Sequence, residues 1–240
     1  MNGSLASVIG LVDGIKIGSD AGQVKNLELV VCPSSVFLIE VGRMLSGTDV
    51  SLGAQNVSDQ ASGAFTGEIS ATMLKECGCR YVIIGHSERR AFYFESDKLV
   101  ADRFEMVVNK GLIPILCVGE SLKEREEGST EAVIVRQLEA VIKSQGIIAM
   151  ANCVIAYEPV WAIGTGQVAT PGQAQAVHRF IRNKLAELDS VVAEKVQILY
   201  GGSMNAKNAK DLLSQPDIDG GLIGGAALNA SDFLAIAQSV

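Results

Sequence analysis

Short apolar runs alternate along the chain with longer stretches in which apolar residues recur at spacings of three and four. The runs are rich in Val, Ile and Leu, and most of them end in glycine, proline or a small polar residue. Near-continuous apolar runs of this length are typical of strands buried on both faces of a parallel sheet. Seven such strands are predicted, at residues 27–32, 50–54, 80–84, 113–118, 152–156, 196–200 and 218–223.

The stretches between these runs predict amphipathic helices, because their apolar residues fall on one face at the helical period. The helices are expected at residues 36–45, 71–76, 97–109, 131–144, 171–188, 206–213 and 231–238, with a leading helix at residues 4–17. Thr170 followed by Pro171 is a favourable helix start, since threonine caps the first turn and proline suits the first helical position. Strict alternation of strands and helices predicts right-handed βαβ units and a parallel sheet.

Seven strand–helix units behind an orphan leading helix indicate an α/β fold of the (β/α)8 barrel type whose first β-strand is missing from the sequence. We expect one barrel domain over residues 1–240, because such barrels usually span about 250 residues. The competing architecture is an open doubly wound sheet, which would suit an odd number of strands. That architecture requires a glycine-rich nucleotide loop after its first strand, and the sequence has none there.

The leading segment allows a second interpretation. Residues 5–12 are apolar and partly β-branched, with Gly10 inside the run and Gly14 soon after it. Such a segment is a poor helix by intrinsic propensity. Loss of one strand from a closed barrel would expose two sheet edges. We therefore consider the hypothesis that this segment, or a strand from a partner, occupies the place of the missing strand.

Composition and charge narrow the classes of function. Apolar residues make up 48% of the chain, which is enough for a sizeable core, and the formal net charge is −7. An acidic chain disfavours a nucleic acid or an acidic membrane as the general partner. No apolar run approaches the roughly 18 residues of a membrane span. The five cysteines are expected to be free thiols, and with no visible signal peptide they indicate the cytoplasm.

Two titratable residues stand where chemistry is expected in this fold, at the carboxyl ends of strands. His86 follows the strand at residues 80–84, and Glu158 follows the strand at residues 152–156. A helix N-terminus beside His86 would favour the neutral imidazole, which can donate a hydrogen bond to a carbonyl. A carboxylate at the mouth of an apolar strand is a candidate general base, because burial raises its pKa. A buried structural histidine and a solvent-facing glutamate are the alternatives.

The segment after Glu158 is apolar and ends in glycines, which suits a lid that excludes water when it closes. Its residues are Pro159, Val160, Trp161, Ala162, Ile163, Gly164, Thr165 and Gly166. An ordinary solvent-facing loop is the alternative, but such loops rarely contain a tryptophan and an isoleucine. We therefore favour the lid.

Paired glycines end the last two predicted strands. Gly201 and Gly202 precede Ser203, and Gly224 and Gly225 follow Leu222 two residues later. Glycine lets backbone N–H groups approach an anion closely, and the loops after the seventh and eighth strands are the usual phosphate site of (β/α)8 barrels. Backbone amides would then bind an anionic ligand that the overall charge of the chain does not attract.

The motifs at these strand ends closely resemble those of the triosephosphate isomerase family. They include Gly85-His86-Ser87-Glu88-Arg89-Arg90, Tyr157-Glu158-Pro159-Val160-Trp161-Ala162-Ile163-Gly164-Thr165-Gly166, Tyr200-Gly201-Gly202-Ser203 and Gly221-Leu222-Ile223-Gly224-Gly225. The resemblance covers essentially the whole chain, and the motifs follow one another in family order.

The resemblance implies the interconversion of glyceraldehyde 3-phosphate and dihydroxyacetone phosphate, a step of glycolysis and gluconeogenesis. By resemblance, Glu158 is the base and a neutral His86 is the electrophile that acts on the enediolate; the family is a well-known example of such pKa tuning. Glu88 belongs to the same catalytic group. The residues implied to hold the phosphate are Gly164, Ser203, Leu222, Gly224 and Gly225.

The resemblance also implies a homodimer in which Thr66 reaches the neighbouring active site, with no metal and no organic cofactor. One departure matters. The family begins with a strand that ends in Asn-x-Lys, and this sequence contains no such motif ahead of Met1-Asn2-Gly3. Glu88, which resembles the partner of that lysine, would lose its counter-ion. Loss of one preorganised donor costs about 10²- to 10³-fold in rate, so we expect either impaired isomerase activity or, as the alternative, an inactive phosphate-binding barrel or scaffold.

Overall fold

The computed structural model describes residues 1–20, 27–163 and 168–239. Within them, one parallel sheet contains seven strands in the order β1-β2-β3-β4-β5-β6-β7. The strands are β1 (Leu29–Val31), β2 (Val50–Ala54), β3 (Tyr81–Ile84), β4 (Ile113–Val118), β5 (Val154–Tyr157), β6 (Gln197–Tyr200) and β7 (Gly220–Gly221). This sequential order confirms the barrel-type alternation and excludes a doubly wound sheet, whose strand order reverses at a switch point.

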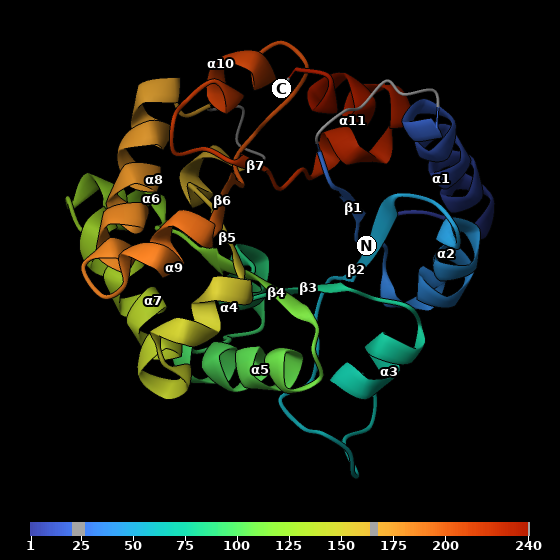
Figure 1. The fold of residues 1–240 in the computed structure, drawn as a ribbon, viewed down its shortest axis with the longest axis horizontal. Coiled ribbons are helices and arrows are strands. Elements are labelled where there is room, and N and C mark those ends of the chain that lie inside the picture. Colours follow the sequence, from blue (N-terminus) through green and yellow to red (C-terminus); the bar gives the residue numbers. More distant parts are fainter. Residues whose placement is uncertain (21–26, 164–167, 240) are drawn as a thin grey trace.

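The helices surround the curled sheet, as Figure 1 shows. They are α1 (Leu5–Asp20), α2 (Leu38–Leu45), α3 (Ala71–Glu76), α4 (Ser87–Phe92), α5 (Asp97–Asn109), α6 (Leu122–Glu126), α7 (Thr130–Gln145), α8 (Pro171–Ala186), α9 (Ser190–Lys195), α10 (Ala209–Leu213) and α11 (Ala230–Ala237). No helix in the described part of the chain is long and apolar enough to cross a membrane.

Helix α8 confirms the helix predicted at residues 171–188 to within two residues, and α9, which begins at Ser190, is a further short helix that was not predicted. The Asp189 side chain accepts hydrogen bonds from the backbone N–H groups of Val191 and Val192, which makes it the N-cap of α9. Helix α4 begins directly after His86, in agreement with the helix N-terminus expected there, although its six residues are too few to show a helical period and its range was not predicted.

The leading segment is helical, so the hypothesis that residues 5–12 replace a strand is wrong. Helix α1 lies between α2 and α11 (Figure 1) and buries Val8, Val12 and Ile15. Its glycines permit this close packing: a Cβ on Gly14 would lie 2.8 Å from the Cβ of Ala230, and one on Gly18 would lie 2.3 Å from Leu234. Tertiary packing therefore outweighs the low helix propensity of glycine.

Strand side chains alternate between two buried layers, as the two-residue period of a strand requires. In β3 and β4, Val82, Ile84 and Leu116 pack in the large core beneath the helices, whereas Ile83 and Ile115 belong to a smaller core inside the curl of the sheet. Among the described residues the strand pairing ends at β1 on one side and at β7 on the other. The carboxyl ends of β3, β4, β5 and β6 are neighbours, which gathers the loops that follow them.

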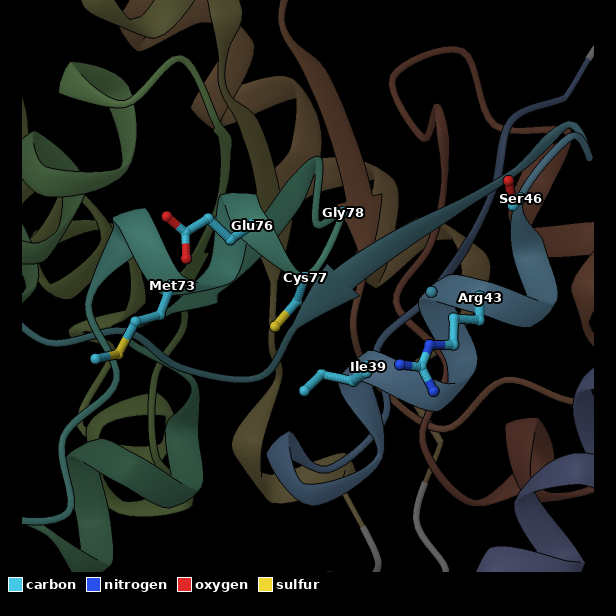
Figure 2. Close-up of a pocket in the computed structure, with 8 residues that line it drawn as sticks. Ile39, Arg43, Ser46, Met73, Glu76, Cys77 and Gly78 are labelled. Carbon is cyan, nitrogen blue, oxygen red and sulfur yellow. The ribbon is translucent and has the colours of Figure 1, made fainter.

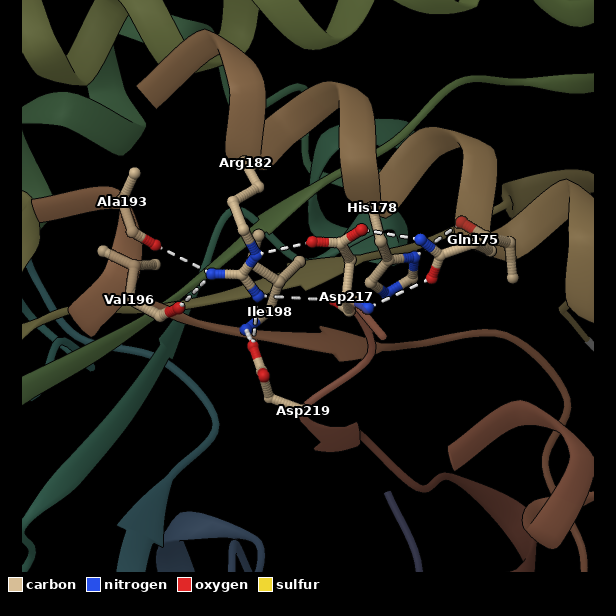
Figure 3. A network of polar contacts seen from close by, with 9 residues as sticks. Gln175, His178, Arg182, Ala193, Val196, Ile198, Asp217 and Asp219 are labelled. Carbon is tan, nitrogen blue, oxygen red and sulfur yellow. Dashed lines mark hydrogen bonds and ion pairs between the residues drawn. The ribbon is translucent and has the colours of Figure 1, made fainter. Parts of the chain in front are cut away.

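A charged network joins the outer elements at the amino ends of the last strands (Figure 3). The Arg182 guanidinium of α8 donates to Asp217 Oδ1 at 2.8 Å and to Asp219 Oδ2 at 2.7 Å. It also donates to the carbonyl oxygens of Ala193 at 2.8 Å and Val196 at 3.1 Å. This single side chain therefore ties α8 and α9 to the segment that precedes β7.

All five cysteines are free thiols in the structure. Burial raises the pKa of Cys32, Cys79 and Cys153 to about 12. Thiols of this kind are inert packing residues, since the thiolate is the reactive form.

Candidate active site

Glu158 leaves the end of β5 with its backbone fixed by both neighbouring strands. Its N–H donates to Val118 O of β4 at 2.8 Å, and the N–H of Gly201, after β6, donates to Tyr157 O at 2.7 Å. The Glu158 side chain is 2% exposed. The fold therefore places one buried carboxylate at the centre of the carboxyl ends of the strands.

The structure brings Glu158 and His86 together, as their positions at strand ends predicted. His86 Nε2 lies 3.0 Å from Glu158 Oε1. The carboxylate also accepts two hydrogen bonds from Ser87, one from its backbone N–H at 2.8 Å and one from its hydroxyl at 3.0 Å. Ser87 was missed by the sequence analysis, although its place at the first position of α4 could have marked it as a donor to an anion.

The second nitrogen of His86 faces the start of α4. Nδ1 accepts a hydrogen bond from the Glu88 backbone N–H at 3.3 Å, which makes His86 the N-cap residue and leaves Nε2 to carry the proton toward Glu158. The Glu88 side chain is 68% exposed, with Oε2 at 3.9 Å from His86 Nδ1. Within the described residues, no lysine or arginine nitrogen lies within 4.0 Å of the Glu88 carboxylate.

The electrostatics of His86 differ from the expectation based on the helix N-terminus alone. Burial lowers the pKa of His86, but the hydrogen bond and the negative charge of Glu158 raise it, and the net pKa lies above its ordinary value. Glu88 adds to the increase and Arg89 opposes it. The expectation omitted the carboxylate 3.0 Å away.

The described part of the predicted lid, Pro159 to Ile163, packs against the loop after β4. Val160–Ala162 form a 3-10 turn, and the Trp161 indole N–H donates to Glu120 Oε1 at 3.0 Å. Glu120 is 0% exposed and also accepts the Tyr157 hydroxyl at 3.1 Å and Arg125 Nη1 at 3.0 Å. Sequence reasoning missed Glu120, since nothing local marks a buried carboxylate. Gly164, Thr165 and Gly166 lie outside the described residues.

The proposed phosphate residues sit on the loops after β6 and β7. Ser203 donates to Ala162 O twice, from its backbone N–H at 3.3 Å and from its hydroxyl at 2.7 Å. Leu222 donates its N–H to Tyr200 O at 2.9 Å, and Gly224 precedes a 3-10 turn, Gly225–Leu228. A Cβ on Gly224 or Gly225 would meet nothing within 4 Å. These glycine peptides therefore border open space, and Ser203 ties the lid to the same loop.

Two other predicted or visible features lie apart from Glu158. Thr66 is exposed on the loop between β2 and α3, which projects beyond the ring of helices (Figure 1). A pocket between α2 and α3, shown in Figure 2, is lined by Ile39, Gly42, Arg43, Ser46, Met73, Glu76, Cys77 and Gly78. None of the strand-end residues described above lines that pocket.

Comparisons with known proteins agree with the geometry at the strand ends. The profile of the family "Triosephosphate isomerase" matches residues 1–240. The chain is 54% identical over 239 residues to the triosephosphate isomerase of Thiobacillus denitrificans, covering 100% of this chain and 94% of that protein. It is 56% identical over 239 residues to that of Dechloromonas aromatica, covering 100% and 95%, and 53% identical over 240 residues to that of Hydrogenovibrio crunogenus, covering 100% and 94%. The chain therefore belongs to the triosephosphate isomerase family, a family of intramolecular isomerases with the (β/α)8 fold.

Proposed function

We propose that this chain, as one domain spanning residues 1–240, interconverts glyceraldehyde 3-phosphate and dihydroxyacetone phosphate in glycolysis and gluconeogenesis. One observation carries the proposal: Glu158 Oε1, after β5, and His86 Nε2, after β3, lie 3.0 Å apart at the carboxyl ends of the two strands that flank β4. A carboxylate base and an imidazole donor at this spacing can act on the two carbons and two oxygens of one small substrate. Relatives that are 54% and 56% identical to this chain carry the name triosephosphate isomerase.

In the proposed mechanism, Glu158 removes a proton from the carbon next to the substrate carbonyl. His86 donates from Nε2 to the carbonyl oxygen and stabilises the enediolate that forms. The imidazole then passes a proton between the two oxygens, so that the former carbonyl becomes a hydroxyl and the hydroxyl becomes the new carbonyl, and Glu158 returns its proton to the neighbouring carbon. The Ser87 bonds hold Glu158 in a resting position, so the carboxylate must leave Ser87 and His86 to reach the substrate. The reaction moves protons between neighbouring atoms, so that one carbon is reduced as the other is oxidised with no net change, and the proposal includes no metal or cofactor.

The phosphate would be held by backbone N–H groups of Gly164, Ser203, Gly224 and Gly225, with Leu222 lining the same site, while residues 159–166 close over it. The Ser203 N–H would turn from Ala162 O to the phosphate, and the Leu222 N–H stays on Tyr200 O. The two hydrogen bonds that Ser203 donates to Ala162 O support this assignment, because they link the lid to the loop after β6. A closed lid excludes water and strengthens the interactions of His86 with the enediolate.

We further propose that two copies of the chain form a homodimer in the cytoplasm, with Thr66 bracing the partner's active site. Three consecutive aromatic side chains at the end of α4 support a protein partner: Phe92, Tyr93 and Phe94 are 73%, 64% and 85% exposed. Phe65, beside Thr66, is exposed as well. Exposed apolar clusters mark association sites. Sedimentation of the Phe65→Asp variant should show monomers where the unchanged chain shows dimers.

A second candidate function is an inactive phosphate-binding barrel, favoured by one observation. Among the described residues Glu88 has no lysine or arginine within 4.0 Å, so no cation is held beside this carboxylate to stabilise the enediolate. In this case the glycine loops would still bind phosphate. Impaired turnover is the intermediate outcome.

An isomerase assay on the unchanged chain, Glu158→Ala and Glu139→Ala separates these functions. Glu139 is an exposed glutamate paired with Lys143 and serves as the matched control. Activity that is lost in Glu158→Ala and kept in Glu139→Ala supports the isomerase. No activity in any chain, together with binding of inorganic phosphate, supports the second function, and neither activity nor phosphate binding overturns both.

A further inference from the structure

Gly119, directly after β4, packs closely against the backbone of Glu158. A Cβ built on Gly119 would lie 1.8 Å from Glu158 O and 2.7 Å from its carbonyl carbon. Backbone contacts of this kind cannot be relieved by a rotamer change, so no other residue fits. Two backbone bonds flank the contact, from Glu158 N–H to Val118 O at 2.8 Å and from Val160 N–H to Glu120 O at 3.1 Å. The position of the Gly119 peptide therefore sets the position of the Glu158 backbone.

The Gly119 peptide is held from its other side by a single side chain. Gln137, on α7, accepts the Gly119 N–H through Oε1 at 2.8 Å and donates Nε2 to Gly119 O at 3.2 Å. Gln137 is 4% exposed, and its side-chain amide imitates a strand neighbour with one acceptor and one donor. A two-point contact fixes both the distance and the plane of the residue it holds.

We propose that Gln137 is a positioning residue for Glu158 and acts through Gly119. The chain of contact runs from the α7 side chain to the glycine and from the glycine to the main chain of the base. The inference rests on the proposed role of Glu158 as the base. Proton transfer is sensitive to such placement, since a displacement of about 1 Å can cost roughly 100-fold in rate.

Gln175 on α8 offers a matched control. Its amide makes the same kind of two-point contact, donating Nε2 to Asp217 Oδ2 at 2.6 Å and accepting the Asp217 N–H at 3.1 Å (Figure 3). Gln175 lies in the Arg182 network and has no contact with Gly119 or Glu158 among its hydrogen bonds in the described residues. Methionine at either position keeps an unbranched side chain of similar length and removes both bonds.

The kinetic test compares Gln137→Met with Gln175→Met well below the unfolding midpoint of each. We expect kcat of Gln137→Met to fall about 10- to 100-fold, with KM within about threefold because the phosphate contacts lie elsewhere. Gln175→Met should keep kcat. In the Glu158→Ala background, Gln137→Met should cause no further loss, because the group it positions is absent.

A second readout does not need activity. The chain has two histidines, so NMR titration follows His86 with His178 as the internal reference. Glu158, Glu88 and Arg89 are the charges that act on His86, and Glu158 has the largest influence among them. Displacement of Glu158 in Gln137→Met should lower the titration midpoint of His86 toward that of Glu158→Ala and leave His178 unchanged, whereas Gln175→Met should not move His86.

The outcomes separate this inference from the proposed function. An unchanged chain without isomerase activity overturns the proposed function, and the His86 titration then decides the positioning role alone. The inference is overturned if folded Gln137→Met keeps both kcat and the His86 midpoint. It is also overturned if Gln137→Met lowers kcat by the same factor in the Glu158→Ala background as in the unchanged chain. A lowered His86 midpoint confined to Gln137→Met supports it.

Discussion

The two ends of the parallel strands carry polar networks of different design. At the amino ends, Arg182 is held by two carboxylates and two carbonyl oxygens, and every partner is fixed by packed elements. At the carboxyl ends, Glu158 is held by Ser87 and His86, two neighbours on one short loop. Loss of Arg182 would leave the carboxylates of Asp217 and Asp219 without their cation, whereas in the proposed mechanism Glu158 exchanges its partners for a substrate. The first arrangement favours stability and the second favours reaction.

The largest expected effect is a loss of kcat, caused by replacing Glu158 at the carboxyl ends of the strands. Replacement Glu158→Gln should lower kcat by about 10²- to 10⁴-fold, the usual contribution of a general base. The amide keeps the size of the carboxylate but accepts through one oxygen only, so we expect the free energy of unfolding to fall by about 1–3 kcal/mol, as for one or two lost hydrogen bonds, without loss of the fold. Kinetics and thermal melts on the same preparation check this. A variant that unfolds at a much lower temperature would show that Glu158 also has the structural role assigned here to the amino ends.

The converse is expected at the amino ends. Replacement Arg182→Met leaves Asp217 and Asp219 without their cation, and we expect a loss of about 2–4 kcal/mol in the free energy of unfolding, below the value for fully buried pairs because these side chains are partly exposed. Urea unfolding measures the loss. The kcat of the folded fraction should stay within about twofold, and a large decrease in kcat would break the contrast between the two ends.

A smaller effect on both stability and kcat is expected at Ser87, which holds Glu158. Replacement Ser87→Ala removes the hydroxyl bond to Glu158 but keeps the backbone N–H bond. We expect about 1 kcal/mol less stability, as for one hydrogen bond to a charged group that keeps another donor. Because only the resting position is weakened, kcat should change less than about tenfold. A loss comparable to Glu158→Gln would mean that Ser87 takes part in proton transfer.

The two histidines predict opposite slopes of stability with pH. The folded-state pKa of His86 is raised, so its contribution is complete below the unfolded pKa, about 6.5, and is lost as pH rises through the folded pKa. For His178, burial lowers the pKa against the opposing Ala174 and Leu199 backbone bonds and the Asp219 and Asp217 charges. Stability therefore falls as pH drops from 6.5 toward that folded pKa.

Unfolding free energies between about pH 5 and pH 8 check these slopes. The variant His86→Asn should remove the decrease above pH 6.5, and Glu158→Gln should weaken it, because the carboxylate is what raises the pKa of His86. The decrease on the acid side should remain in both variants. A decrease above pH 6.5 that persists in His86→Asn would assign it to other groups.

Periodicity predicted the strands and most helices because burial on both faces of a sheet leaves a direct record in local sequence. It also predicted the leading helix at residues 4–17, but not the role of the glycines there, since Gly14 and Gly18 are contact points with α11 that no local rule detects. At the site, position at strand ends was enough to pair Glu158 with His86. Ser87, Glu120 and Gln137 were missed, because their roles depend on side chains that meet only after folding.

The contact between α1 and α11 joins segments that are more than 200 residues apart in the chain. Closing so long a loop costs conformational entropy before any contact is gained, so this seam is expected to form late in folding and to open first. Hydrogen exchange should then be fastest in α1 and α11 among the long helices. Helix α1 can therefore unfold or detach briefly from α11 while β3 to β6, and the Glu158 site at their carboxyl ends, stay folded.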